Sequence, residues 1–157
     1  MVIKVLVDTT YLLPTFGIMV ENLTDEDLLR LRRIKLAGLV EYYCLDIIWI
    51  ELLGKIYKEL EKRRIDLREH IKIAIRSLKE SKFYTWISLT SRAIELACQL
   101  RKLGHKDIID NLLYATSKTE DMVFMSMDDE LKVFLRDHGF DTKRIMSHKE
   151  LIALFKQ

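Results

Sequence analysis

The chain of 157 residues is long enough for one domain with a substantial buried core, and we expect residues 1–157 to form a single domain. Its net charge of +2 excludes a polycation that coats nucleic acid indiscriminately, and two cysteines are too few for a disulfide framework. Because the sequence holds no apolar run of about 18 residues, the length that spans a membrane, we expect a soluble cytoplasmic protein that has no membrane partner and keeps Cys44 and Cys98 in its core.

The predicted elements alternate between short apolar strands and longer helices. In the first half we expect a strand at 2–7, a helix from about 10, a helix from the Thr24 cap to 38, a strand at 39–45, a helix at 46–64, a helix from the Asp66 cap to 82 and a strand at 83–87. In the second half we expect helices at 90–103 and 107–118, a strand at 122–126, a helix at 128–138, a weak strand at 144–146 and a last helix capped by Ser147. This alternation predicts a three-layer α/β/α fold whose central parallel sheet has four to five short strands.

Four acidic residues lie where the surrounding sequence predicts buried structure. Asp8 and Asp128 each follow an apolar strand, while Glu51 and Asp110 lie among apolar neighbours on helices, and the helix around Glu51 is apolar nearly all round. An unpaired buried carboxylate costs several kcal/mol or becomes protonated. Because ligands gather at the carboxyl ends of parallel strands, we expect the four acids to converge there around a divalent cation. Oxygen ligands without nearby His or Cys favour Mg²⁺ or Mn²⁺.

Each acid also has a simpler explanation when it is taken alone. Asp8 and Asp128 could be turn residues at strand ends or N-caps of the helices that follow, and Asp110 could pair with a lysine. The metal hypothesis therefore depends on all four acids meeting in space.

The segments that carry the four acids resemble the PIN (PilT N-terminus) domain family of nucleases, which also contains the VapC-type toxins. The resemblance extends over essentially the whole chain and lies in the segments Val-Leu-Val-Asp-Thr-Thr-Tyr-Leu-Leu at 5–13, Glu-Leu-Leu at 51–53, Asp-Asn-Leu-Leu-Tyr-Ala-Thr-Ser at 110–117 and Phe-Met-Ser-Met-Asp at 124–128. It implies a PIN-like fold and a metal-dependent endoribonuclease that hydrolyses single-stranded RNA. It also implies a homodimer and, for a toxin, a small antitoxin protein as partner.

The resemblance assigns a role to each acid. It implies that Asp8 and Asp110 bind Mg²⁺ or Mn²⁺ directly, that Asp128 binds a second ion or water at the ion, and that Glu51 acts through water or as a base.

Four further residues are supporting candidates under the same resemblance: Thr10, Asp107, Thr116 and Asp129. Of these, Thr10 matches a small polar residue near the metal, and Asp107 and Asp129 are alternative ligands. The chain departs from the family where alanine after the third acid is Asn111.

A basic segment stands out from a mildly acidic chain. Residues 55–82 carry a net charge of +5, against −3 for the rest of the chain. The spacing places Lys55, Lys58 and Lys62 on one face of a helix, and Arg68, Lys72 and Arg76 on one face of the next. We expect this helical hairpin to bind the phosphate backbone of RNA. A solvated face with internal salt bridges is the alternative.

Two other functions stay open at this point. The chain could be a non-catalytic PIN-like module that binds nucleic acid or protein, or a phosphohydrolase that uses Asp8. The second fits poorly, because a haloacid-dehalogenase-like site needs an aspartate where Thr10 lies. An NTPase or dinucleotide enzyme is disfavoured because the sequence has no GxxxxGK[ST] or GxGxxG loop. We expect all four histidines at the surface: His70, His105, His138 and His148.

Overall fold

A parallel sheet forms the centre of the molecule. The computed structural model describes residues 1–63 and 68–156, and in this part of the chain the sheet has five strands in the order β3-β2-β1-β4-β5. The strands are β1 (Ile3–Val7), β2 (Val40–Leu45), β3 (Tyr84–Ile87), β4 (Val123–Met125) and β5 (Ile145–Met146). The strands β1 and β4 lie side by side in the middle, so the residues that follow them share one edge of the sheet.

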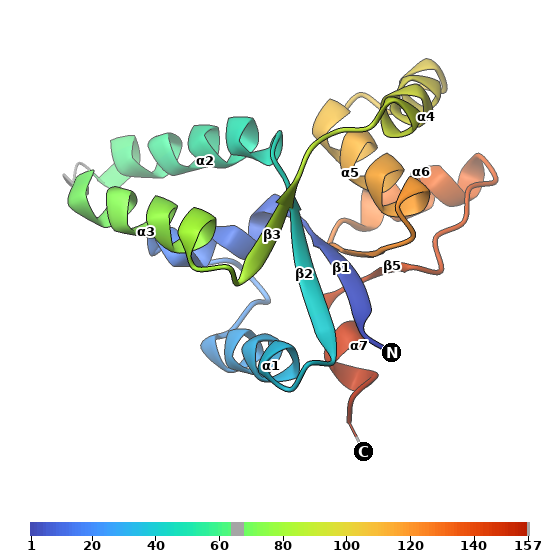
Figure 1. The fold of residues 1–157 in the computed structure, drawn as a ribbon. Coiled ribbons are helices and arrows are strands. Elements are labelled where there is room, and N and C mark those ends of the chain that lie inside the picture. The colour runs from blue at the N-terminus through green and yellow to red at the C-terminus, as the bar shows by residue number, and fades with distance from the viewer. Residues whose placement is uncertain (64–67, 157) are drawn as a thin grey trace.

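Helices cover both faces of this sheet, as the three-layer prediction requires (Figure 1). One side carries η1 (Thr9–Phe16), α1 (Asp25–Leu36), α2 (Ile48–Arg63) and α3 (Arg68–Glu80). The other side carries α4 (Ser91–Lys102), α5 (Ile108–Thr119) and α6 (Asp129–Asp137). The last helix, α7 (His148–Ala153), packs against α1. Among the described residues, no helix is both long and apolar enough to pass through a membrane.

The two central strands are buried almost completely, because helices cover both their faces. Val5, Leu6 and Val7 in β1 and Phe124 and Met125 in β4 are each at most 2% exposed. This explains why the strands read as continuous apolar runs instead of alternating polar and apolar residues. Burial continues past the strand ends, since the polar residues Asp8 and Ser126 that follow are also buried.

Most of the predicted helix starts are confirmed where the structure describes them, but the helix expected from Asp46 begins at Ile48, and the Asp46 carboxylate accepts hydrogen bonds from Lys79 and Ser88 instead. Thr24 with Asp27, and Ser147 with Glu150, form complete capping boxes. Side chains of three further residues accept a hydrogen bond from the first turn of their helices: Thr90, Asp107 and Asp128. The predicted cap at Asp66 lies outside the described residues.

The surface position expected for His148 is wrong. His148 is 1% exposed, and its backbone N–H donates to the Tyr11 hydroxyl at 3.1 Å. The Tyr11 hydroxyl also lies 3.1 Å from Nδ1 of His148, and Nε2 lies 3.3 Å from Oδ2 of Asp27. The contacts join η1, α1 and α7. These partners are distant in sequence, so local pattern gives no sign of the burial.

Two expected core positions are also wrong. Cys98 is exposed, whereas Cys44 is buried as expected. Ile50 is 71% exposed and Tyr57 is 56% exposed, so α2 is not buried all round. The helix buries Ile48, Leu52 and Ile56 along one face and leaves the opposite face open.

Candidate active site at the carboxyl edge of the sheet

Asp8 lies at the point where β1 ends and η1 begins. Its carboxylate caps η1 by accepting a hydrogen bond from the Thr9 N–H at 2.8 Å, and its second oxygen accepts one from the Ser126 hydroxyl at 2.9 Å. The pKa of Asp8 is raised from 3.8 to about 6, chiefly by burial and also by the charge of Glu51. The hydrogen bond from Ser126 opposes this rise. Asp8 therefore caps η1, while burial and the charge of Glu51 destabilise its ionised form.

Ser126 joins the ends of the two central strands. Its hydroxyl donates to Asp8 and accepts a hydrogen bond from the Asp128 backbone N–H at 3.1 Å. The side chain is 1% exposed. Ser126 was not among the predicted site residues, although a polar residue at the end of an apolar strand, two positions before an acid, is a visible signal in the sequence. The serine sets where Asp8 and Asp128 lie relative to each other.

Asp110 and Asp128 come together from two different helices. Asp110 lies in the first turn of α5, and Asp128 caps α6 by accepting a hydrogen bond from the Leu131 N–H at 3.1 Å. The pKa of Asp110 is raised far above its usual value, first by burial and then by a hydrogen bond with the carboxyl group of Asp128. The charges of Asp8 and Asp107 add to this rise. A second negative charge this close is unfavourable unless a proton or a cation is present.

Glu51 extends the acidic group toward α2. It lies in the first turn of that helix, and its charge acts on Asp8. Lys55, one turn further along, forms an ion pair with Glu51 at 2.8 Å and lowers the pKa of Asp8. Glu51 is partly exposed, with 22% of its side chain accessible, so it is less buried than its apolar neighbours suggested. Lys55, predicted to bind RNA, thus has an acidic partner inside the site.

Pairwise interactions link the four predicted acids at one edge of the sheet: the charge of Glu51 acts on Asp8, and Asp8 and Asp128 act on Asp110. They do not form a ready-made metal cage: within residues 1–63 and 68–156, no group of three or more His, Cys, Asp or Glu side chains is arranged to hold a metal ion. Each acid is instead engaged by an internal partner. The donor set still fits a hard divalent cation, because all donors are carboxylate oxygens and two of the acids have raised pKa values that a cation would relieve.

The four supporting residues lie in different settings, and Asp107 has a direct contact with one of the acids. Asp107 lies near Asp110 and caps α5, where it accepts the Asp110 N–H at 3.0 Å, whereas Asp129 is exposed in the first turn of α6. Thr10 is half-buried in η1. Thr116 is 1% exposed, and its hydroxyl has no hydrogen-bond partner among the described residues.

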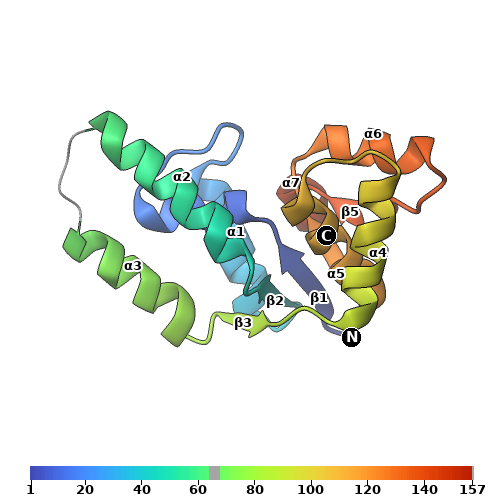
Figure 2. The ribbon, with the colours of Figure 1, turned by 90° about the horizontal axis from the view of Figure 1, so that it is seen from above.

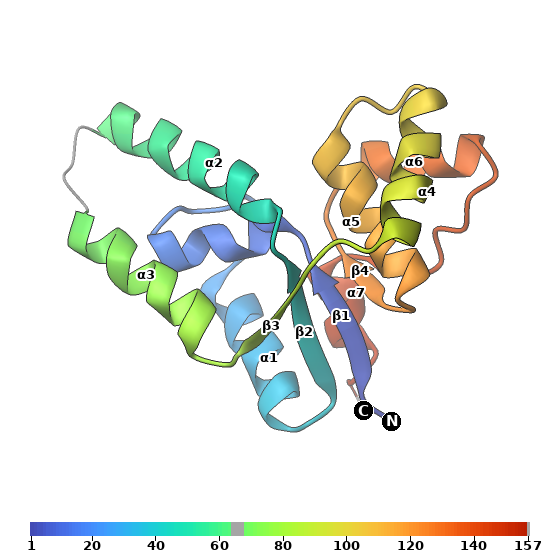
Figure 3. The same ribbon diagram turned by 45° about the horizontal axis from the view of Figure 1, so that its top comes forward.

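The basic helices extend away from the acidic edge. Both α2 and α3 pack against η1, the element that Asp8 caps, and their far ends project from the body of the molecule (Figures 2 and 3). Lys58 and Lys62 are exposed on α2, and Arg68 and Lys72 are exposed on α3. Lys62 lies 3.6 Å from Glu59, so part of its charge is locally paired. From Glu51 to Lys62 the axis of α2 rises by about 16 Å.

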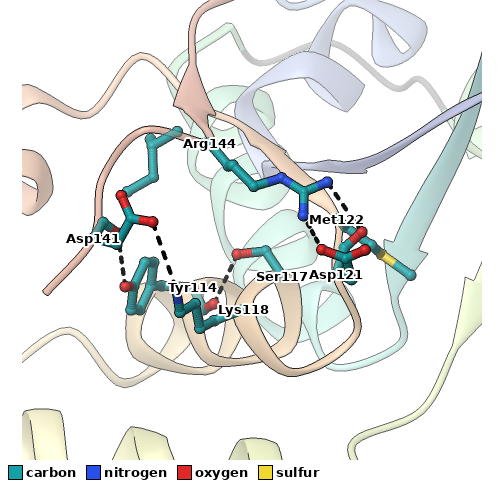
Figure 4. Close-up of a pocket in the computed structure, with 8 residues that line it drawn as sticks. Tyr114, Ser117, Lys118, Asp121, Met122, Asp141 and Arg144 are labelled. Atoms are coloured by element: carbon teal, nitrogen blue, oxygen red, sulfur yellow. Dashed lines mark hydrogen bonds and ion pairs between the residues drawn. The ribbon is translucent and has the colours of Figure 1, made fainter.

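Two cavities lie away from the acids. One of about 840 Å³ lies between α1 and α3 and includes Leu36 and Phe83 in its lining. The other, of about 170 Å³, is polar and lies beside α5 (Figure 4). Its charges are paired internally: Lys118 lies 3.6 Å from Asp141, and Arg144 is paired with Asp121. Neither cavity contains the predicted site residues.

This chain resembles known proteins in its structure and not in its sequence. No protein-family model matches the sequence, and no curated protein matches it either. The fold is similar to that of PAE2754 from Pyrobaculum aerophilum, with a TM-score of 0.60 and 15% identity over 97% of this chain and 88% of that one. It is also similar to VapC20 of Mycobacterium tuberculosis, a toxin that cleaves the sarcin-ricin loop, with a TM-score of 0.52 and 16% identity over 87% of this chain and 96% of that one. The chain therefore has a PIN/VapC-like fold.

Proposed function

We propose that the protein is a divalent-metal-dependent ribonuclease that hydrolyses phosphodiester bonds in single-stranded RNA. One observation carries the proposal: Glu51, Asp8, Asp110 and Asp128 arrive from four separate segments and act on one another's charges at the carboxyl edge of the sheet. Chance placement of surface acids does not explain a set in which Asp8 is buried, the other three are partly buried and two have raised pKa values. The fold shared with a nuclease toxin supports the same proposal.

Asp8 and Asp110 are the proposed direct ligands of Mg²⁺ or Mn²⁺, with Asp128 and Glu51 beside them. When bound, such an ion supplies Lewis-acid activation of the phosphodiester and of the attacking water. Ser126 holds Asp8 and the backbone of Asp128 in register. Lys55 forms an ion pair with Glu51 on α2, and the proposed role of Glu51 is to accept a proton or a hydrogen bond from water.

The proposed RNA-binding surface lies on α2 and α3. The exposed cations on these helices attract a phosphate backbone, and α2 leads from the outer cations to Glu51 at the acidic edge. Accordingly, we propose Lys58, Lys62, Arg68 and Lys72 as RNA contacts, with Lys55 closest to the acids.

The proposed biological role is that of a toxin, with a small antitoxin protein as partner, because VapC20 is named as a toxin. An RNA-processing enzyme would use the same chemistry. A homodimer is also proposed, as the resemblance implies, and sedimentation should then give twice the chain mass of 18.6 kDa. A monomer at working concentration would contradict the dimer and leave the chemistry as proposed.

A non-catalytic RNA-binding module is the second candidate. It is favoured by the internal partners of the acids: Lys55 neutralises Glu51, and Asp110 is hydrogen bonded with Asp128. In this case RNA would bind without metal and stay intact.

The test is cleavage of a mixed single-stranded RNA pool with Mg²⁺ or Mn²⁺. Wild type should cut, Asp8→Asn and Asp110→Asn should be inactive, and Asp137→Asn, which changes an exposed acid at the far end of α6, should retain activity. Equal cutting by all four proteins would trace the activity to a contaminant. Binding of intact RNA by all four would favour the non-catalytic candidate.

A further inference from the structure

Asn111, which stands where the PIN family has alanine, forms two hydrogen bonds with His105. Asn111 is 1% exposed, and both polar atoms of its side chain have partners on the same residue. Its amide nitrogen donates to the His105 backbone carbonyl at 2.9 Å, and its amide oxygen lies 2.6 Å from Nδ1 of the His105 ring. A buried amide is costly without such partners. The two hydrogen bonds fix the turn between α4 and α5 against the first turn of α5.

The chemistry of the groups sets the direction of both hydrogen bonds. A backbone carbonyl can only accept, so the Asn111 nitrogen must face it. The Asn111 oxygen then faces the ring, and because this oxygen can only accept, Nδ1 of His105 must carry a proton. The ring is therefore held in one tautomer and one orientation by Asn111.

The fixed ring of His105 also contacts the helix that begins at Asp128. Its centroid lies 4.9 Å from that of Phe134 on α6, with an interplanar angle of 51°. On its other side, the His105 backbone N–H donates to the Leu100 carbonyl of α4 at 3.2 Å. Three helices therefore meet at this residue. One carries Asp110 in its first turn, and another is capped by Asp128.

We propose that the pair of His105 and Asn111 is a positioning clamp that sets the orientation and separation of Asp110 and Asp128 for metal binding. The inference rests on the proposed function, because it assigns the clamp a role in that same site. Asn111 directly follows Asp110, so a shift of its amide moves the backbone that carries the acid. His105 acts through Asn111 and Phe134 and is a positioning residue, not a catalytic one.

Two substitutions separate the parts of the clamp. Asn111→Ala removes both hydrogen bonds, and His105→Phe removes the ring N–H donor but keeps an aromatic ring against Phe134. The matched control is Tyr114→Phe, which removes one hydrogen bond from the same helix: the Tyr114 hydroxyl donates to the Asp141 carbonyl at 2.8 Å, in the cavity beside α5 that contains none of the four acids. Calorimetric titration with MnCl₂ alone gives the metal affinity. Amide hydrogen exchange of the metal-free proteins reports on the first turn of α5.

Either substitution in the clamp should weaken Mn²⁺ binding by about 10-fold, which is a common effect of changing a residue that supports metal ligands. The double variant should be little worse than the weaker single variant, because the two residues act as one unit. Exchange should increase at residues 110–113 in both variants, while Tyr114→Phe should bind Mn²⁺ like wild type. His105→Phe carries the test if Asn111→Ala does not fold.

Unchanged Mn²⁺ affinity in Asn111→Ala and His105→Phe, beside a clear loss in Asp110→Asn, would overturn the clamp and leave the proposed metal site standing. An equal loss in Tyr114→Phe would also overturn it, since any destabilisation of α5 would then have the same effect. If wild type bound no Mn²⁺, or Asp110→Asn bound it like wild type, the proposed function would fail and the role of the clamp with it.

Discussion

Asp8 carries a charge that the fold makes unfavourable. Its pKa is about 6 in the folded protein and 3.8 ordinarily, so the folded state binds this proton more tightly than the unfolded state. Ionisation of Asp8 therefore lowers stability as pH rises from about 4 to 6, and the loss is complete above the folded pKa. The corresponding free energy is about 3 kcal/mol, at about 1.4 kcal/mol for each pKa unit.

Asp8→Asn should therefore raise the melting temperature of the metal-free protein by several degrees at pH 8, and the gain should shrink toward pH 4. Thermal unfolding followed by circular dichroism across this pH range measures the effect. Asp137→Asn, at an exposed position at the end of α6, is the matched control and should change little. A melting temperature below that of wild type at pH 8 would mean that the hydrogen bonds of Asp8 outweigh its charge penalty.

Ser126→Ala should raise the pKa of Asp8 above its present value of about 6, because the hydroxyl that stabilises the ionised carboxylate is lost. A carbon-13 NMR titration of the aspartate carboxyl groups measures this pKa. Ser117→Ala is the control, since the Ser117 hydroxyl donates to the Tyr114 carbonyl instead. No change in Asp8 would show that the serine bridge does not govern its charge.

At this scale, the burial of the predicted acids was easier to predict from the sequence than the contacts that each acid makes. Strand ends and apolar neighbours pointed to Asp8 and Asp110, because burial of a charge is visible in local pattern. The partners Ser126 and Lys55 depend on the pairing of β1 with β4 and on the exit angle of α2, which no local pattern records.

At the scale of elements, α2 and α3 hold the proposed RNA contacts in a fixed relation to the acids. Both helices pack against η1, and η1 starts at Asp8. Lys58 is exposed, whereas Lys55 and Lys62 lie 2.8 Å and 3.6 Å from acidic partners, so we expect Lys58 to contribute most per residue.

Reversing Lys58 and Lys62 to Glu should weaken RNA binding and reduce the dependence of log Kd on log salt by about 2, one for each lost phosphate contact. Fluorescence anisotropy with a labelled single strand measures both quantities, and Mn²⁺ binding should stay as in wild type. Lys149→Glu on α7 is the control for the loss of a surface charge. An unchanged salt slope would assign these cations to a solvated face.

Helix boundaries were predictable where capping chemistry is local. Thr24, Thr90, Asp107 and Ser147 begin their helices as the sequence indicated, because a capping side chain bonds within three residues of itself. The burial of His148 and the exposure of Cys98 and Ile50 were not predictable in this way. They depend on which helix faces pack against other elements.

At the scale of the whole molecule, the topology brings the site together. The chain leaves β1 at Asp8 for one face of the sheet and returns through β4 to Asp128 after crossing the other face, so acids 120 residues apart become neighbours at one edge. The alternation of strands and helices made this parallel arrangement predictable. The fold shared with VapC20 agrees with it, although at 16% identity the likeness speaks for the fold alone.

We propose above all that these distant carboxylates share a divalent cation. A crystal grown with Mn²⁺ and measured at a wavelength with manganese anomalous signal locates such an ion. We expect an anomalous peak between Asp8 and Asp110, with Asp128 or Glu51 beside it, and no such peak in Asp110→Asn. A wild-type crystal with no peak at this edge, or with manganese bound elsewhere on the protein, would contradict it.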